Sequence, residues 1–307
     1  AYGTQSADLY QIDVATGTVS KAADLPAGFD RSNGAAFAQS LGTDGVVLFT
    51  TGTTTLWLGA WDRFTGVTNV VGDLGSFGVP GGSKIYSGDY FNGWYYFVVN
   101  NTDALGKAQV TGTSGAYSLV SATKISDMWS NSRSHGYGDI VITPGGIMYA
   151  HASRDGGGAE FFTADLNQAT PTATQLGSPP YMHNGITFGL DGKLYGGLGV
   201  NSSNKDWFEV SLANGSSTFL RSGAVSGMSD MTMGACTPSQ YLVDNDPFAN
   251  ADFGDYSFVS GASSIVNTNI RLGSLVDAES TISNDATASA DDVKGVDDED
   301  GVTFGPF

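Results

Sequence analysis

Three aspartates stand at corresponding places in a repeated pattern and are the residues best suited to chemistry. Asp89, Asp139 and Asp230 each follow a small residue and lead into a short, mostly apolar run. Carboxyl groups about 5 to 10 Å apart can hydrolyse a glycosidic bond, one of them acting as the acid. The other two copies carry Asn33-Gly34 and Asn184-Gly185, and short polar residues also hydrogen-bond to their own turns. The pattern therefore allows ligand binding, catalysis or a structural role.

The remaining residues give little support to catalysis. The histidines are His135, His151 and His183, and none of them lies in a HExxH metal-binding pattern. The sequence shows no nucleophile elbow, Walker loop or dinucleotide fingerprint. The sequence contains repeated β units, and His135 and His183 each precede the predicted innermost strand of a unit, in two successive units. We therefore expect both side chains at the same end of the fold. We predict that the protein is not an enzyme, with a glycosidase as the least favoured alternative.

Carbohydrate binding is the main alternative function, because sugars stack on indole faces. Most tryptophans in repeated β units pack in the core. Trp129 differs, since it lies in the polar stretch KISDMWSNSRSHGYG. We therefore take Trp129, together with Asp89, Asp139 and Asp230, as candidate ligand-binding residues.

The charge balance excludes some classes of partner. The chain has 31 acidic and 13 basic residues, a net charge of -18, and would be repelled by nucleic acid and by anionic membranes. Cys236 is the single cysteine, so no disulfide forms within the chain. No apolar run is long enough to span a membrane. We expect an extracellular or cell-surface protein in which Ala1 is a mature terminus.

Internal repeats predict the fold. Four dipeptides suited to two-residue hairpin turns recur at separations of 48, 53 and 46 residues, and each is followed by an apolar strand. This period matches a four-stranded blade of a β-propeller with its connection. The four dipeptides are Asp44-Gly45, Asn92-Gly93, Gly145-Gly146 and Asp191-Gly192.

The ends of the repeat region complement one another. An inner-strand pattern at residues 229–236 lacks the strands that should follow it, whereas residues 1–25 resemble outer strands without an inner one. Joining the two closes a ring and hides strand edges. We predict an all-β, five-bladed propeller over residues 1–240, closed in this way, with six or seven blades as alternatives. An acidic extension then covers residues 241–307.

The extension has the composition of a calcium-binding segment. Residues 243–307 contain 13 acidic and two basic residues, and hard cations such as Ca²⁺ prefer carboxylate and carbonyl oxygens. DDEDG at 297–301 is the densest cluster, although it lacks the alternating ligands of an EF-hand loop. An acidic linker to a further domain remains the alternative. The candidate metal ligands are Asp277, Glu279, Asp291, Asp292, Asp297, Asp298 and Asp300.

Three motifs in this extension carry a resemblance to a known family. DFGDYSF from Asp252, RLGSLVDAE from Arg271 and ADDVKGVDDEDGVTF from Ala290 resemble the region ahead of GEVED-type repeats in large bacterial surface proteins. The usual GDAP is GDYS here. The preceding repeats, with LYQIDVATGTVSKAADL from Leu9, are similar to the propeller domain of unknown function that accompanies such regions.

Together these features predict a structural or adhesive module of a bacterial surface protein or fibre, with Ca²⁺ stiffening the acidic extension. The expected partners are glycans or proteins of a cell surface or extracellular matrix, or further copies of the chain in a fibre. A lectin-like propeller is the alternative.

Overall fold

The structure is a computed structural model in which the chain divides into two compact units. One unit comprises residues 1–189 and 193–235, and the other comprises residues 190–192 and 236–307. The structure describes residues 1–14, 16–30, 32–51, 56–78, 84–99, 104–128, 135–154, 158–189, 191–197, 206–222, 228, 230–232, 251–253 and 263–265.

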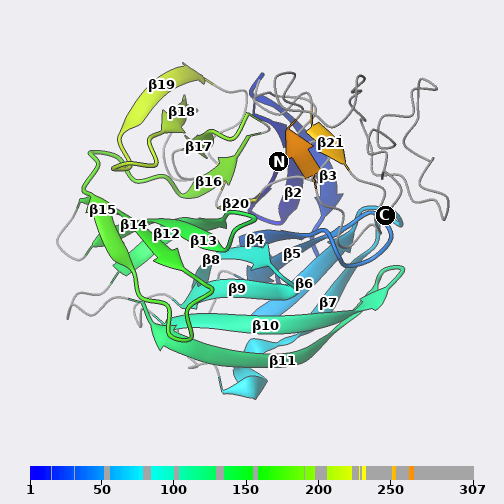
Figure 1. Cartoon of the computed structure of the whole chain (residues 1–307). Helices are drawn as coiled ribbons and strands as arrows, with labels where there is room; N and C mark the ends of the chain where they lie inside the picture. The colour runs from blue at the N-terminus through cyan, green and yellow to red at the C-terminus, as the bar shows by residue number, and fades with distance from the viewer. Residues whose placement is uncertain are drawn as a thin grey trace, which may run out of the picture. The chain divides into compact units, whose positions relative to one another are not determined.

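The first unit is a five-bladed β-propeller, which confirms the predicted fold class and number of blades (Figure 1). Each blade is a four-stranded antiparallel sheet, and blades 1 to 4 run from the inner to the outer strand in chain order. Blade 1 is β4 (Ser32–Ala38), β5 (Val46–Thr51), β6 (Trp57–Asp62) and β7 (Thr68–Asp73); blade 2 is β8 (Ile85–Phe91), β9 (Trp94–Val99), β10 (Ala104–Thr113) and β11 (Ala116–Asp127); blade 3 is β12 (His135–Ile142), β13 (Ile147–Arg154), β14 (Ala159–Asp165) and β15 (Thr174–Gly177); blade 4 is β16 (Gly185–Phe188), β17 (Leu194–Gly197), β18 (Asp206–Val210) and β19 (Ser217–Ser222). A short 3-10 helix, η1 (Leu74–Phe77), follows blade 1.

Blade 5 closes the ring in the predicted manner. Its inner strand is β20 (Asp230–Thr232), and its outer strands are β1 (Tyr2–Gln5), β2 (Asp8–Asp13) and β3 (Thr18–Asp24). β1 pairs antiparallel with β20, with Thr4 opposite Asp230 and Tyr2 opposite Thr232. Both ends of the propeller sequence therefore lie in one sheet.

The turns adopt the backbone that their residues favour. Asn92 and Gly93 have φ values of 48° and 84°, as a hairpin turn with two left-handed residues requires. Gly45 and Gly146 also have positive φ, at 80° and 81°. A side chain at these glycines would be strained, which explains why the dipeptides mark the repeat so clearly.

Five hydrophobic clusters hold the propeller together, one at each interface between neighbouring blades. Side chains alternate along a strand, so a buried strand serves two interfaces. In β9, for example, Tyr95 and Phe97 pack toward blade 1 whereas Tyr96 packs toward blade 3. The clusters are centred on Leu48, Leu58, Tyr95 and Phe97 (blades 1 and 2); Tyr96, Leu105, Ile140 and Phe162 (2 and 3); Val141, Phe161, Ile186 and Leu194 (3 and 4); Ile12, Trp207, Met228 and Met231 (4 and 5); and Leu9, Phe29, Phe37 and Phe49 (5 and 1).

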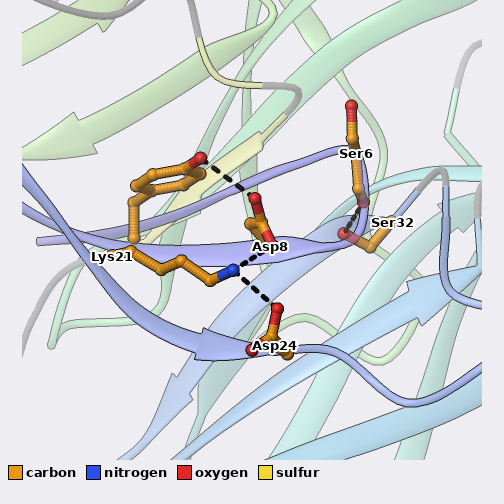
Figure 2. A network of polar contacts seen from close by, with 6 residues as sticks. Ser6, Asp8, Lys21, Asp24 and Ser32 are labelled. Atoms are coloured by element: carbon orange, nitrogen blue, oxygen red, sulfur yellow. Dashed lines mark hydrogen bonds and ion pairs between the residues drawn. The ribbon is translucent and has the colours of Figure 1, made fainter.

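Polar contacts add to the interface between blades 5 and 1 (Figure 2). The hydroxyl of Ser32 in β4 donates a hydrogen bond of 3.2 Å to the carbonyl oxygen of Ser6. On the surface of blade 5, the Lys21 ammonium lies 2.9 Å from an oxygen of Asp8 and 2.6 Å from one of Asp24. Exposed ion pairs of this kind contribute roughly 0 to 1 kcal/mol. Both ion pairs lie within blade 5, so the hydrophobic cluster and the hydrogen bonds hold blade 5 to blade 1.

A hairpin of blade 2 clasps blade 1 in a way that the repeat does not predict. β10 and β11 have 10 and 12 residues, and their turn reaches Asp62 at the end of β6. The buried Asp62 carboxylate accepts hydrogen bonds of 2.9 Å from the backbone N–H groups of Phe64, Thr65 and Gly115. The hydroxyl of Tyr117 donates a further, short one. Two donors belong to Asp62's own turn and two to blade 2.

These donors determine the charge state of Asp62. Burial raises the pKa of its carboxyl, but the hydrogen bonds from Tyr117, Thr65, Gly115 and Phe64 outweigh it, so the pKa lies below its usual range. Asp62 is therefore a buried anion at neutral pH. Its contribution to stability is present above the pKa of an unfolded aspartate and is lost as the pH falls below it.

In the second unit, β21 (Ala251–Phe253) and β22 (Ser263–Ile265) form a short antiparallel pair. Among the residues that the structure describes in either unit, no helix is long and apolar enough to span a membrane.

We predict that Asp62→Asn lowers the free energy of unfolding by about 2 to 4 kcal/mol, because an amide cannot accept four hydrogen bonds. Asp165→Asn is the matched control, since Asp165 caps the corresponding turn of blade 3 through Asn167 and Gln168, on the protein's surface. This control should cost about 1 kcal/mol or less. Urea unfolding at pH 7 measures the free energy of unfolding of both variants. Equal losses would show that the hydrogen bonds from blade 2 to Asp62 add no stability.

Candidate functional site

The three candidate aspartates meet at the centre of the propeller. Asp89 in β8, Asp139 in β12 and Asp230 in β20 are all on inner strands and are 5%, 1% and 0% exposed. We expected these residues to begin their strands, which holds for Asp230 alone. β8 and β12 start four residues earlier and continue through β-bulges, which lie just before Asp89 and Asp139.

Asp139 connects three blades through backbone N–H groups. Its Oδ1 accepts a hydrogen bond of 2.7 Å from the N–H of Ile140 in its own blade. Its Oδ2 accepts one of 2.7 Å from Ile186 in blade 4 and one of 3.2 Å from Met231 in blade 5. One carboxyl group thus satisfies donors on strands that do not pair with one another.

Asp89 has a similar role between blades 2, 3 and 5. Its Oδ2 accepts a hydrogen bond of 2.6 Å from the N–H of Ile142 in blade 3. Its Oδ1 accepts bonds from the N–H of Tyr90, at 2.9 Å, and from the hydroxyl of Thr232, at 3.1 Å.

Asp230 and Thr232 attach blade 5 to blade 1. The two oxygens of Asp230 accept hydrogen bonds from the N–H groups of Gly34 and Ala35, at 3.0 and 2.9 Å. The Thr232 hydroxyl oxygen accepts one of 2.9 Å from the N–H of Phe37. We call Asp89, Asp139, Asp230 and Thr232 the central hub.

Burial sets the protonation of the hub. It raises the pKa of Asp89 to about 7, against the opposing effect of hydrogen bonds from Ile142, Tyr90 and Thr232. It also raises the pKa values of Asp139 and Asp230 well above the usual range. A side-chain hydrogen bond between these two carboxyl groups lowers the pKa of Asp139 and raises that of Asp230. We infer that Asp230 holds the proton of the pair and donates it toward Asp139.

This geometry supports a structural role for the three aspartates. A general acid or nucleophile must present its carboxyl group to a substrate. Here every carboxyl oxygen of the hub accepts at least one backbone N–H, and all three side chains are buried. The carboxyl groups instead satisfy the N–H groups that the bulged inner strands leave free.

The other predicted site residues lie outside the described residues. This applies to Trp129 and to all seven candidate calcium ligands, Asp277, Glu279, Asp291, Asp292, Asp297, Asp298 and Asp300. Within the described ranges, no three histidine, cysteine, aspartate or glutamate side chains cluster in a way that could hold a metal ion.

The histidines are placed differently from the expectation. His183 precedes β16, as its spacing predicts, but it is fully buried and its neighbour is His151 of β13. His135 is the first residue of β12. The proximity of His151 and His183 was not predicted, because it depends on how blades 3 and 4 pack.

Blade 4 also carries an aromatic surface that the tryptophan search missed. Tyr181 and Phe219 are 52% and 55% exposed, and both rings contact the buried ring of Phe208 at centroid distances of 6.0 Å. Tyr181 stacks on Phe208, whereas Phe219 meets it edge-on. Only one signal in the sequence could have indicated this surface. The segments WFEV and TFLR, which form the two strands of a hairpin, each carry aromatic residues.

Comparisons with known proteins assign no family. Neither the known family models nor the curated proteins contain a match. Among solved structures, a chain of a nidogen/laminin complex has 15% identity and a TM-score of 0.46 over 68% of this chain and 84% of its own. A Bacteroides thetaiotaomicron protein of unknown function has 16% identity and a TM-score of 0.44, over 74% of this chain and 59% of its own. A putative 6-phosphogluconolactonase from Bacteroides uniformis has 12% identity and a TM-score of 0.37, over 74% of this chain and 71% of its own. Similarity at this level transfers no function.

We predict that Asp139→Asn destabilises the protein more than Asp230→Asn does. The first variant points an amide NH₂ at backbone donors in a buried site, at a cost of about 4 kcal/mol. The second keeps a donor toward Asp139 and loses one acceptor, at a cost of about 2 kcal/mol.

Urea unfolding of the two variants at pH 7 measures this difference. The opposite order would show that the proton of the pair lies on Asp139.

Proposed function

We propose that this chain is a non-enzymatic, extracellular module that displays adhesive surfaces on a rigid propeller, as part of a bacterial surface protein or fibre. The observation that carries the proposal is the central hub. The carboxyl groups that a propeller glycosidase would direct at its substrate are occupied here by backbone N–H groups from neighbouring blades.

Rigidity is the property that such a module needs. Each blade is held to its neighbours by a hydrophobic cluster, and the hub joins blade 5 to blades 1, 2 and 3. Loops on a rigid scaffold can bind a partner without a large ordering cost. A closed ring also leaves few exposed strand edges for unwanted pairing.

The aromatic surface of blade 4 favours carbohydrate as the bound partner. Tyr181 and Phe219 expose large ring faces that the buried Phe208 holds in place. Rings that are fixed before binding lose little entropy when a flat apolar sugar face stacks on them. A lectin-like propeller is therefore the second candidate, and it would use the same surface as an adhesive module.

The location and the calcium dependence rest on the sequence. The motifs DFGDYSF, RLGSLVDAE and ADDVKGVDDEDGVTF support placement in a bacterial surface protein. The acidic clusters around Asp291 and Asp297 support Ca²⁺ binding, which would stiffen the segment that follows the propeller. Proteins or glycans of a cell surface or matrix, or further copies of the chain in a fibre, are the proposed partners.

We predict that the chain binds glycans or matrix proteins through the aromatic surface. Replacing Tyr181 and Phe219 together with alanine should weaken binding about tenfold or more, since each ring contact contributes about 0.5 to 1.5 kcal/mol. Phe64→Ala is the matched control, because Phe64 is a 68% exposed aromatic residue in blade 1. A glycan array and immobilised matrix proteins supply the ligands.

Two results would contradict this function. One is the absence of binding to every glycan and matrix protein tested. The other is turnover of a glycoside that Asp139→Asn abolishes while the folded fraction, measured by circular dichroism, is unchanged.

We predict that Ca²⁺ raises the melting temperature of the full chain and that a chelator lowers it. A ligand present at 100 times its Kd adds about 2.7 kcal/mol when it binds only the folded form. The variant with Asp297, Asp298 and Asp300 all changed to asparagine should lose the response. Differential scanning calorimetry measures it, and equal melting temperatures with Ca²⁺ and with chelator would exclude the proposed stabilisation.

A further inference from the structure

Two buried histidines face each other between blades 3 and 4. His151 lies on β13, and His183 lies just before β16. They are 1% and 0% exposed, and their ring centroids are 5.0 Å apart at an interplanar angle of 78°. Phe161 of β14 packs on His151 and Phe208 of β18 packs on His183, each at a centroid distance of 5.3 Å. The pair is therefore enclosed by aromatic rings.

Most of the polar atoms of this pair have no partner. The Nε2 atom of His183 is 2.6 Å from the Ser217 hydroxyl. The Nδ1 atom of His183 and both ring nitrogens of His151 are buried without a hydrogen bond. The carbonyl groups of Gly215 and Gly197 lie near enough to favour the protonated rings, but they do not reach hydrogen-bonding geometry. A charged imidazolium in this place would be poorly solvated.

Among the described residues, no carboxylate near the pair is free to balance such a charge. Asp139 is the cross-strand neighbour of His151, but its carboxyl group is already committed to three backbone N–H groups and to the pair with Asp230, and burial raises its pKa well above the usual range. Glu160 and Glu209 directly adjoin Phe161 and Phe208 in their strands, so they point to the opposite faces of their sheets.

The other charged and titratable groups nearby do not change this balance. Lys193 is paired with Glu209 at 2.9 Å, and Arg221 contacts Gly17 of blade 5. Tyr149 stacks on Phe161 and Tyr181 stacks on Phe208.

We propose that His151 and His183 form an acid-sensitive contact, whose protonation opens the interface between blades 3 and 4 while the interface between blades 1 and 2 stays closed. The opening follows from geometry, since two cations cannot remain 5.0 Å apart in an aromatic enclosure without an anion. It is independent of the adhesive function proposed above.

The pKa values give the pH range of the opening. Burial, followed by the proximity of His183, lowers the pKa of His151 to about 3, and burial lowers that of His183 to about 4. An exposed histidine has a pKa of about 6.5, so the open state binds more protons. The closed interface is thus fully stable above pH 6.5 and loses stability as the pH falls toward 4. At pH 5.0 each imidazole favours opening about 30-fold, and the two together about 1000-fold.

The aromatic surface of blade 4 depends on the same contact. The buried ring of Phe208 contacts His183 and also contacts the exposed rings of Tyr181 and Phe219. Opening of the interface would expose His183, on which Phe208 rests, and so loosen the support of both exposed side chains.

Hydrogen exchange of the full chain at pH 7.5 and 5.0 tests the proposal, after correction for the intrinsic pH dependence of amide exchange. Protonation of the hub acids changes the opening of β16 to β19 by the same factor in every variant, so the double variant His151→Phe/His183→Gln, which has neither titrating ring, is the reference. Between these pH values, the rise in opening should exceed that of the double variant about 1000-fold in the unaltered protein and about 30-fold in His151→Phe, which keeps a ring without a titrating group.

Phe208→Leu is the control, because it loosens the same interface and leaves both histidines in place. It should raise opening at both pH values and keep the ratio between them that the unaltered protein shows. Strands β4 to β7 should show no acid-dependent rise. The proposal is overturned if the double variant keeps the ratio of the unaltered protein or if all blades open together. NMR signals of the His151 and His183 imidazoles that titrate near pH 6.5 in the folded protein would also overturn it.

Discussion

Backbone N–H groups that no strand pairs with, at the centre of the ring, are the constraint on which this structure depends. The inner strand of each blade has a sheet neighbour on one side only, and a buried N–H without an acceptor costs about 1 to 3 kcal/mol. Asp89, Asp139 and Asp230 supply the missing acceptors to strands of other blades. The disc is thus joined at its axis by side-chain carboxyl groups and between its blades by apolar clusters.

This solution explains the acidic inner strands without invoking catalysis. Burial raises the pKa values of Asp139 and Asp230, and Asp139 accepts three backbone N–H groups in the same place. A hydrophobic residue could fill the same volume but could not accept those hydrogen bonds.

The periodic part of the fold could be predicted from the sequence, because local chemistry determines it. Turn dipeptides such as Asn92-Gly93 need left-handed backbone, and the unmatched half-repeats at residues 1–25 and 229–236 indicate the closure. The clasp at Asp62 and the contact between His151 and His183 could not be predicted, because each joins residues of different blades with no shared motif. The sequence predicted that the three aspartates lie on inner strands, but their partners depend on bulges that the sequence does not mark.

Closure by β20 has a consequence for biosynthesis. The three outer strands of blade 5 leave the ribosome, or cross a membrane, long before Asp230 to Thr232 exist to complete their sheet. Until then Tyr2 to Gln5 present an open strand edge, and the N–H groups of Gly34 and Ala35 lack their acceptor. The cooperative folding step must therefore follow synthesis of nearly the whole propeller, and a chaperone that shields strand edges would act on its N-terminal residues.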